Sequence, residues 1–330
     1  MSILVTGADG FVGQHMIRYL LDTGEQVVAL THTVEPVFPL LSKEERAALE
    51  VCNAVEITNA AALGPIITRF RPQVVFHLAA QSHVPTANSD PHTTFHTNVM
   101  GTLALMHELW RARAVPQYDP TVLITSSAQV YGSVPNNSLP IREDEPIHPD
   151  NAYAASKAAQ EITALSYFYG YSMRVIVTRA FNHIGPGQSL GFVVPAFARQ
   201  LVEAEEGLRP PLIKVGNLEA RRDFTDVRDV VNAYLLLAHL GQAGKVYNIC
   251  SGEPVSIATI LDRLCARARI KINIEVDAAR LRPLDIPVLF GDNRQLREIT
   301  GWQPTYSLDQ TLYDVYEEQR AAVASRQSRS

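Results

Sequence analysis

Short apolar runs alternate with longer stretches of helical periodicity through the first 180 residues. The apolar runs predict strands buried on both faces, because they are continuously apolar and do not alternate with polar positions. They lie at Ile3–Thr6, Gln26–Leu30, Val74–Leu78, Val122–Ser126 and Arg174–Thr178. The stretches of helical length between them are Phe11–Leu21, Ala60–Phe70, Thr93–Arg113 and Ala152–Tyr169. This order predicts right-handed βαβ crossovers and a parallel sheet with helices on both faces.

The rhythm changes after about residue 180, where turn-forming residues become frequent. A helix is expected at Val194–Glu206, and Val227–Leu240 followed by Val246–Cys250 restores a helix–strand unit. Further helices fit Ile257–Arg269 and Leu308–Arg320. The sequence therefore predicts an α/β protein with a Rossmann-type, doubly wound parallel sheet in residues 1–180, rejoined by about 226–250. A smaller C-terminal α/β substrate domain is expected in residues 181–330.

Two of the predicted helices carry unusual faces. The first has large apolar residues spaced three and four apart, at Phe95, Val99, Leu103, Met106 and Trp110. The second has a surface of mostly small residues, at Ala154, Ala155, Ala158, Ala159, Ile162 and Leu165. Pattern alone favours burial within the chain, with a dimer made from both helices as the alternative.

Composition narrows the class of protein. The 330 residues are 46% hydrophobic and 19% charged with a net charge of -5, which is typical of a globular protein and argues against nucleic acid as a partner. Three widely spaced cysteines form no CxxC or zinc pattern, which favours a reducing compartment. The first residues predict a strand and no signal peptide, and no apolar run is long enough for a membrane span. We therefore expect a cytoplasmic protein.

Three glycines follow the first predicted strand and open the first predicted helix, in the segment GADGFVG. Glycine is required where a chain turns tightly, where backbone approaches a pyrophosphate, and where a helix packs closely on a strand. The helix N-terminus adds free N–H groups and a partial positive charge. The spacing is GxxGxxG and not the standard GxGxxG, but its place between strand and helix predicts a dinucleotide site. The residues of this predicted site are Gly7, Gly10, Phe11, Val12 and Gly13.

The end of the second predicted strand bears on the choice of dinucleotide. An acidic residue there would bind the 2′-hydroxyl of NAD, and an arginine nearby would accommodate the 2′-phosphate of NADP. The sequence Ala29-Leu30-Thr31-His32 carries neither. The missing carboxylate removes a repulsion against the 2′-phosphate, which favours NADP(H) and leaves NAD(H) open. His32 is either a weak phosphate partner or a solvated loop residue, and the second is favoured.

A serine, a tyrosine and a lysine form the candidate catalytic group. Tyr153 and Lys157 lie four apart on a predicted helix and therefore share a face. Ser127, with Ser126 beside it, lies at the carboxyl end of the strand that precedes this helix, and ligands of open α/β sheets bind outside such strand ends. We therefore expect Ser127, Tyr153 and Lys157 to converge on one substrate carbonyl.

These residue types suit the reduction of a ketone. Hydride addition forms an alkoxide, to which Tyr153 would donate a proton as general acid. Ser127 would donate a hydrogen bond to the carbonyl oxygen and stabilise the developing charge. The ordinary pKa of tyrosine is near 10, and we expect the neighbouring Lys157 ammonium to lower it.

With these residues, the chain resembles the extended short-chain dehydrogenases/reductases of the sugar-nucleotide epimerase/dehydratase group. The resemblance covers nearly the whole chain through TGADGFVG, HLAAQS (His77–Ser82), NVMGT (Asn98–Thr102), SSAQVYG (Ser126–Gly132) and YAASK (Tyr153–Lys157). It implies that Lys157 also holds the nicotinamide ribose, that Asn98 supports the active site, and that Glu56 and Ile57 lie by the adenine. It also implies cofactor contacts at Leu78, Ala79 and Ala80. A homodimer joined by a four-helix bundle is implied too, which reverses the weighting drawn from pattern alone.

The C-terminal half is similar to the GDP-4-keto-6-deoxy-D-mannose reductases, which form GDP-D-rhamnose. The similarity lies in FNHIGPGQ (Phe181–Gln188), VGNLEARRDFTDVRDV (Val215–Val230) and LRPLDIP (Leu281–Pro287). It implies that Asn182, Arg222 and Arg282 meet the diphosphate of a GDP-sugar. Asp285 would lie near the guanosine ribose and Lys214 close to the base. Two arginines suit the oxygens of a diphosphate.

The side chain of Gln129 favours a reductase over a dehydratase. The resembling GDP-mannose dehydratases carry a glutamate at this place, two residues before the tyrosine of the SSAQVYG-type motif, and use it for proton transfer. A neutral amide cannot replace that base, so Gln129 is expected to contact substrate without supporting elimination. Product stereochemistry stays open between GDP-D-rhamnose and GDP-6-deoxy-D-talose. A sugar-nucleotide 4-epimerase and a non-catalytic dinucleotide sensor are the remaining alternatives. No metal site is expected, since His92 and His96 stand without further candidate ligands.

Overall fold

The central feature of the fold is a sheet of seven parallel strands in the order β10-β6-β5-β4-β1-β2-β3. The structure, a computed structural model, describes residues 1–280 and 286–327. The strands are β1 (Ser2–Thr6), β2 (Gln26–Leu30), β3 (Glu50–Cys52), β4 (Val74–His77), β5 (Thr121–Ser127), β6 (Arg174–Ala180) and β10 (Val246–Ile249). The strand order reverses between β1 and β4, which makes their carboxyl ends the expected ligand crevice of a Rossmann-type fold.

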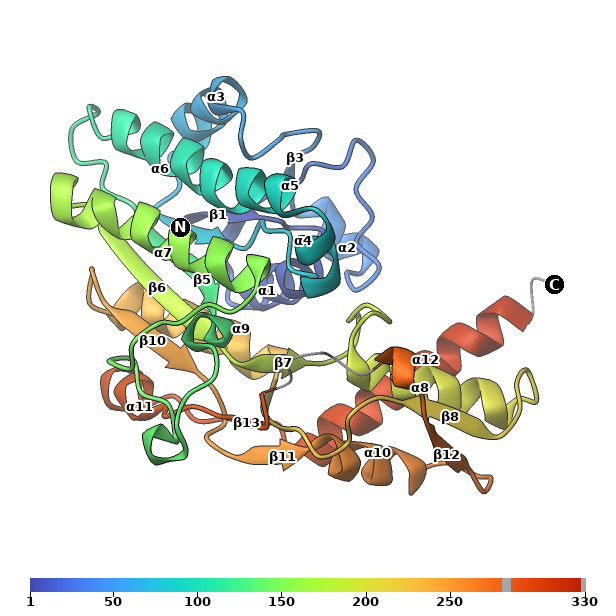
Figure 1. Cartoon of the computed structure of the whole chain (residues 1–330). Coiled ribbons are helices and arrows are strands. Elements are labelled where there is room, and N and C mark those ends of the chain that lie inside the picture. Colours follow the sequence, from blue (N-terminus) through green and yellow to red (C-terminus); the bar gives the residue numbers. More distant parts are fainter. Residues whose placement is uncertain (281–285, 328–330) are drawn as a thin grey trace.

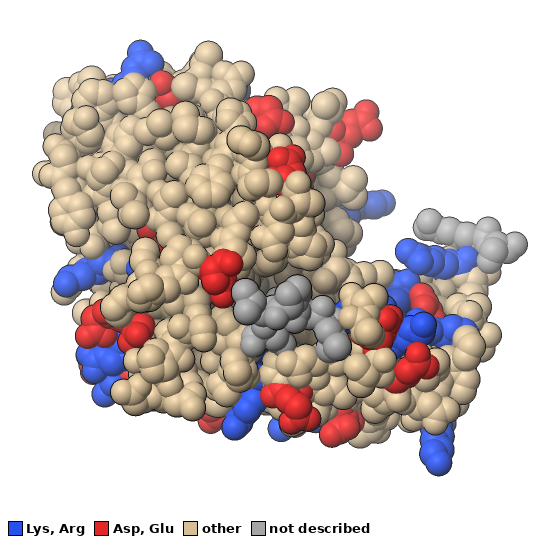
Figure 2. All heavy atoms as spheres, in the orientation of Figure 1, with Lys and Arg blue, Asp and Glu red and all other residues tan. Residues whose placement is uncertain are grey.

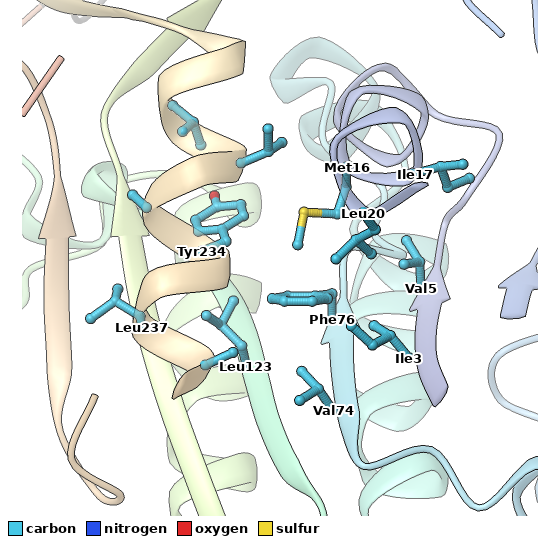
Figure 3. Close-up of a cluster of buried hydrophobic side chains, with 14 of the residues drawn as sticks. Ile3, Val5, Met16, Ile17, Leu20, Val74, Phe76, Leu123, Tyr234 and Leu237 are labelled. Atoms are coloured by element: carbon cyan, nitrogen blue, oxygen red, sulfur yellow. The ribbon is translucent and has the colours of Figure 1, made fainter. Parts of the chain in front are cut away.

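Helices cover both faces of this sheet, as the sequence predicts. One face carries α3 (Ala60–Phe70), α6 (Gly101–Ala112) and α7 (Ala152–Tyr171), and the other carries α1 (Phe11–Asp22), α9 (Val227–Leu240) and α11 (Arg294–Thr300) (Figure 1). Figure 3 shows the second core layer, in which Met16 of α1 and Tyr234 of α9 meet Phe76 of β4. Both faces of the strands are therefore buried, which accounts for their continuously apolar sequence.

The second lobe is built on smaller sheets (Figure 1). A mixed sheet contains β7 (Asn182–Ile184), β9 (Arg221–Asp226), β11 (Pro254–Ser256) and β13 (Val288–Leu289), and a separate pair contains β8 (Leu212–Val215) and β12 (Asn273–Val276). The helices α8 (Val193–Glu205), α10 (Ile257–Cys265) and α12 (Leu308–Gln327) pack on one another over them. The chain returns from the second lobe to the main sheet twice, first as α9, which covers the sheet, and β10, which joins it, and later as α11.

Several predicted bounds need correction. The strand β3 was not expected, because its three residues lie at the sheet edge and two of them are exposed. The predicted helix Thr93–Arg113 is α5 (Pro91–Phe95), a π-helical turn at His96–Met100, and then α6. The helix expected to end at Arg269 ends at Cys265, and the one expected to end at Arg320 continues to Gln327. Short helices also occur at α2 (Lys43–Ala47) and α4 (Val84–Ser89).

Candidate active site

The three candidate catalytic residues lie together at the carboxyl end of β5. Ser127 is the last residue of β5, and Tyr153 and Lys157 occupy the first two turns of α7. All three are buried. A side-chain hydrogen bond joins Tyr153 to Ser127. The structure therefore places the three residues in one region, at the carboxyl end of β5 and the start of α7.

The start of α7 is fixed by its capping residue. Asn151 accepts a hydrogen bond on Oδ1 from the backbone N–H of Ala154, which satisfies one of the free donors of the first turn. The Asn151 amide also donates to Gln129 Oε1 at 3.4 Å, so Gln129 lies beside the beginning of the Tyr153 helix. Sequence reasoning missed Asn151, although an asparagine directly before a helix is a recognised capping signal.

Burial governs the protonation of this group. It raises the pKa of Tyr153 to about 12, opposed by the hydrogen bond with Ser127. It lowers the pKa of Lys157 to about 7, opposed by the charge of Glu161. The expectation that the pKa of Tyr153 is lowered is therefore wrong for this structure, because burial disfavours the charged phenolate and raises the pKa instead. Tyr153 consequently stays protonated at neutral pH, which is the state of a proton donor.

Asn98 connects the π-helical turn to the catalytic helix. Its amide donates to Ser156 Oγ at 2.9 Å and to the Gln81 carbonyl at 3.1 Å, and its Oδ1 accepts from the Gln81 N–H at 2.8 Å. Ser156 Oγ in turn donates to the Tyr153 carbonyl. Asn98 therefore ties the HLAAQS segment to α7, which agrees with a supporting role.

His77, which sequence reasoning did not single out, joins the same region to the glycine turn. Its ring is fully buried, with Nδ1 at 2.9 Å from Thr6 Oγ1 and Nε2 at 2.9 Å from Thr102 Oγ1. Thr6 Oγ1 also accepts from the Ala79 N–H at 3.1 Å. Burial, together with the charge of Lys157, lowers the pKa of His77 to about 3. The imidazole is therefore neutral and links β1 to the start of α6.

The glycine turn fits a dinucleotide. Gly7 has φ +66°, and a Cβ there would lie 2.8 Å from the Ala79 N atom. A Cβ on Gly13 would lie 2.3 Å from the Gly7 carbonyl oxygen. No side chain caps the N-terminus of α1 at Gly10 in the described chain, so its first-turn N–H groups are offered to an anion. The turn can therefore keep this shape, with the N-terminus of α1 beside it, only when positions 7 and 13 are glycine.

The other predicted cofactor residues lie around the same crevice. Phe11 and Val12 begin α1 and are partly buried, and the Phe11 ring is stacked at 6.1 Å on His183 of the second lobe. Leu78, Ala79 and Ala80 follow β4 and are also partly buried. Ile57 is buried against Gly101, whereas Glu56 and His32 are exposed. The exposure of His32 agrees with a solvated loop residue.

The predicted substrate residues are divided among several elements. Asn182 on β7 stands opposite Phe224 on β9, two residues from Arg222, so this pair shares one sheet. Lys214 lies on the separate β8–β12 pair and is exposed. Arg282 and Asp285 lie outside the described residues. The structure therefore brings Asn182 and Arg222 together but does not join Lys214 to them.

Residues 1–280 and 286–327 contain neither a cluster of candidate metal ligands nor a candidate membrane span. No group of three or more histidine, cysteine, aspartate or glutamate side chains in these ranges could hold a metal ion. No helix in them is both long enough and apolar enough to cross a bilayer.

A Rossmann-type sheet, a glycine turn shaped for phosphates and a Ser/Tyr/Lys group at the strand ends define an extended short-chain dehydrogenase/reductase. Comparison with known families narrows this class, because the family model described as GDP-mannose 4,6 dehydratase matches residues 4–315. The chain belongs to this family.

Individual relatives share nearly the full length. A GDP-6-deoxy-D-mannose reductase from Pseudomonas aeruginosa is 37% identical over 310 residues, covering 94% of both chains. A GDP-6-deoxy-D-talose 4-dehydrogenase from Aggregatibacter actinomycetemcomitans is 29% identical, covering 91% of this chain and 92% of that one. The solved structure of RMD from Pseudomonas aeruginosa complexed with NADPH has a TM-score of 0.83 at 34% identity, covering 97% of this chain and 99% of that chain. Thermus thermophilus UDP-glucose 4-epimerase in complex with NAD also has a TM-score of 0.83, at 25% identity, covering 98% of this chain and 100% of that chain.

Proposed function

We propose that this chain reduces the C4 keto group of GDP-4-keto-6-deoxy-D-mannose to give GDP-D-rhamnose, with NADPH favoured over NADH. The observation that carries the proposal is a protonated Tyr153 beside Ser127, with the neutral Gln129 where a dehydratase needs a carboxylate. The 37% identity to a GDP-6-deoxy-D-mannose reductase supports the substrate, and the NADPH complex of a similar structure supports the cofactor.

The residues of the site divide the reaction among them. The reduced nicotinamide supplies the hydride when bound. Ser127 donates a hydrogen bond to the C4 oxygen, and Tyr153 donates the proton that converts the alkoxide to a hydroxyl. Lys157 would bind the ribose hydroxyls of the cofactor. The glycine turn would hold its pyrophosphate, with the Leu78–Ala80 segment beside it and Glu56 and Ile57 by the adenine.

We assign the sugar nucleotide to the second lobe. Asn182 and Arg222 would bind its diphosphate, with Arg282 as a third contact, and Lys214 and Asp285 would lie near the guanosine. We accordingly propose that residues 1–180 with about 226–250 form the dinucleotide domain. The remaining residues would form the substrate domain, apart from α11, which packs on the main sheet. A cytoplasmic location fits three free cysteines.

The reaction is tested by supplying GDP-4-keto-6-deoxymannose with NADPH and following the loss of dihydronicotinamide absorbance. We expect oxidation in one-to-one ratio to product, and an NMR spectrum of the product with the configuration of rhamnose at C4. GDP-mannose with NAD or NADP should remain unconsumed, and its dehydration by the purified protein would overturn the proposal.

A second product is supported by one relative. The 29% identical GDP-6-deoxy-D-talose 4-dehydrogenase acts on the sugar with the opposite C4 configuration. The same NMR spectrum distinguishes the two products. A 4-epimerase would interconvert sugars with no net oxidation of NADPH, so the absorbance assay separates it from both.

We further propose that two copies associate through α6 and α7. Phe95, Met100, Leu103 and Ile162 are exposed on this side, between 37% and 64%, whereas Met106 of the predicted apolar face is buried. Figure 2 shows few charged side chains over these helices. Light scattering should give a dimer for the wild-type chain and a monomer for Ile162→Asp, whereas Val37→Asp, at an exposed valine elsewhere, should remain dimeric. A wild-type monomer at micromolar concentration would contradict this assembly.

A further inference from the structure

A buried ion pair lies one helical turn beyond Lys157 and has no role in the mechanism above. Glu161 of α7 and Arg179 of β6 meet side-on, with Arg179 Nε donating to Glu161 Oε1 at 3.0 Å and Nη2 donating to Oε2 at 2.8 Å. Their side chains are 3% and 8% exposed. The pair is therefore removed from solvent and has the geometry of a strong, charge-assisted contact.

Arg179 is held in place from several directions. It stands in register with Ser126 on β5, next to the catalytic Ser127. Its guanidinium lies 4.8 Å from the centre of the Tyr131 ring, and its Nη1 donates to the Glu143 carbonyl at 3.3 Å. These contacts fix the position of the carboxylate that Arg179 binds.

Stability alone does not explain a pair of this kind. Removing two charges from water is costly, and replacement of buried ion pairs by apolar residues is often neutral or stabilising. The pair is neutral overall, but its negative member, Glu161, is the charge that acts on Lys157. Tyr153, Lys157 and Glu161 follow one another at intervals of four residues on α7, so they share one face of the helix.

The groups around Lys157 are otherwise uncharged. Lys157 Nζ donates to the neutral Gln160 Oε1 at 2.6 Å. Tyr153 on the same helix keeps its proton, and His77 on β4 is neutral because burial lowers its pKa to about 3. Burial also lowers the pKa of Lys157, whereas Glu161 raises it. Within the described chain, Glu161 is thus the carboxylate that favours a charged Lys157.

We propose that Glu161, clamped by Arg179, is a positioning residue that keeps Lys157 charged in its buried site. The ion pair then sets the alkaline limit of cofactor binding and of turnover, which is the pH above which both decline because Lys157 loses its proton. This inference rests on the proposed function, in which the Lys157 ammonium binds the ribose of the dinucleotide.

The variant Glu161→Gln tests the proposal, because it keeps the shape of the side chain and removes its charge. NADPH binding is followed by fluorescence and NADPH oxidation by absorbance, each across the neutral and alkaline range. Both alkaline limits should move to lower pH by about 1 to 2, the size expected for two charges a helical turn apart at an effective dielectric of about 20. Just above neutral pH, the variant's affinity for NADPH should fall about tenfold for every pH unit by which its alkaline limit has moved.

Three further variants serve as controls. Glu161→Asp retains the charge and should restore the alkaline limits of the wild-type chain. The double variant Glu161→Gln/Arg179→Met leaves no unpaired guanidinium in the core. If the single variant fails to fold, the alkaline limits are measured on this double variant instead. Glu108→Gln removes another buried glutamate, which pairs with Arg111 on α6 at 3.0 Å, and should leave both limits in place.

The proposal is overturned if the variants that lack the Glu161 charge fold and have the same alkaline limits as the wild-type chain. The pair would then have a purely structural role. The NADPH-binding arm contains no sugar nucleotide. A wrong substrate assignment would therefore abolish turnover while the pH dependence of binding still reports on Glu161.

Discussion

Replacement of Tyr153 by phenylalanine should remove catalysis while leaving the fold and cofactor binding intact. The hydroxyl lost is the proton donor, and general acid–base catalysis is worth about 10²–10⁴ in rate, or about 3–5 kcal/mol of transition-state stabilisation. The structural cost is smaller. The phenyl ring keeps its buried place, and Ser127 Oγ still accepts the Gln129 N–H at 3.2 Å. A single neutral hydrogen bond contributes about 1 kcal/mol, so the melting temperature should change by a few degrees only.

The assay compares kcat for NADPH oxidation with the Kd for NADPH and with thermal unfolding. Tyr131→Phe is the matched control, because it removes another buried hydroxyl, one that donates to Asn248 Oδ1 at 2.7 Å. The control should lose comparable stability and retain kcat. Tyr153→Phe with near wild-type kcat would refute the assignment of the proton donor. Equal losses of kcat in both variants would show that packing, and not proton transfer, is being measured.

Three other predictions address the cofactor turn, the substrate lobe and the response to pH. Gly13→Ala places a methyl group 2.3 Å from the Gly7 carbonyl oxygen and should abolish NADPH binding, measured by fluorescence, whereas Gly170→Ala, with open space around it, should bind normally. Arg222→Ala should raise the KM for the sugar nucleotide about tenfold or more at similar kcat, and an unchanged KM would place the diphosphate elsewhere. Because burial lowers the folded-state pKa of His77 to about 3, the unfolded chain binds more protons below pH 6.5, and stability is lost as pH falls through that range. Urea unfolding should show that the free energy of unfolding falls by an amount on the order of 2 kcal/mol from pH 7 to pH 5. A His77→Gln variant whose free energy of unfolding depends on pH in the same way would contradict this cause.

Helices and strands with a clear local pattern of apolar positions could be predicted from the sequence. The strands β1 and β2 and the helices α1 and α9 are long apolar or amphipathic segments with clear ends, so their bounds agree with the structure within a residue or two. The site could be anticipated where spacing and position coincide, as for Tyr153 and Lys157 after the strand that ends at Ser127.

Features that depend on distant neighbours could not be predicted. β3 exists because its backbone pairs with β2, and its own three residues carry little strand signal. The direction in which the pKa of Tyr153 moves depends on burial, which opposes the effect inferred from the nearby lysine. The Glu161–Arg179 pair requires α7 to pack against β6, although the spacing of Glu161 from Lys157 is visible in the sequence.

The place of β10 beside β6 has a consequence for how the polypeptide is made. During synthesis β6 emerges well before β10, since β7, α8, β8, β9 and α9 are translated between them. Until β10 arrives, the outer edge of β6 is an unpaired row of backbone donors and acceptors. Nascent chains stalled or truncated before Val246 should therefore be prone to aggregate through this edge. The same order means that a fragment ending at residue 180 would not be a soluble stand-in for the dinucleotide domain.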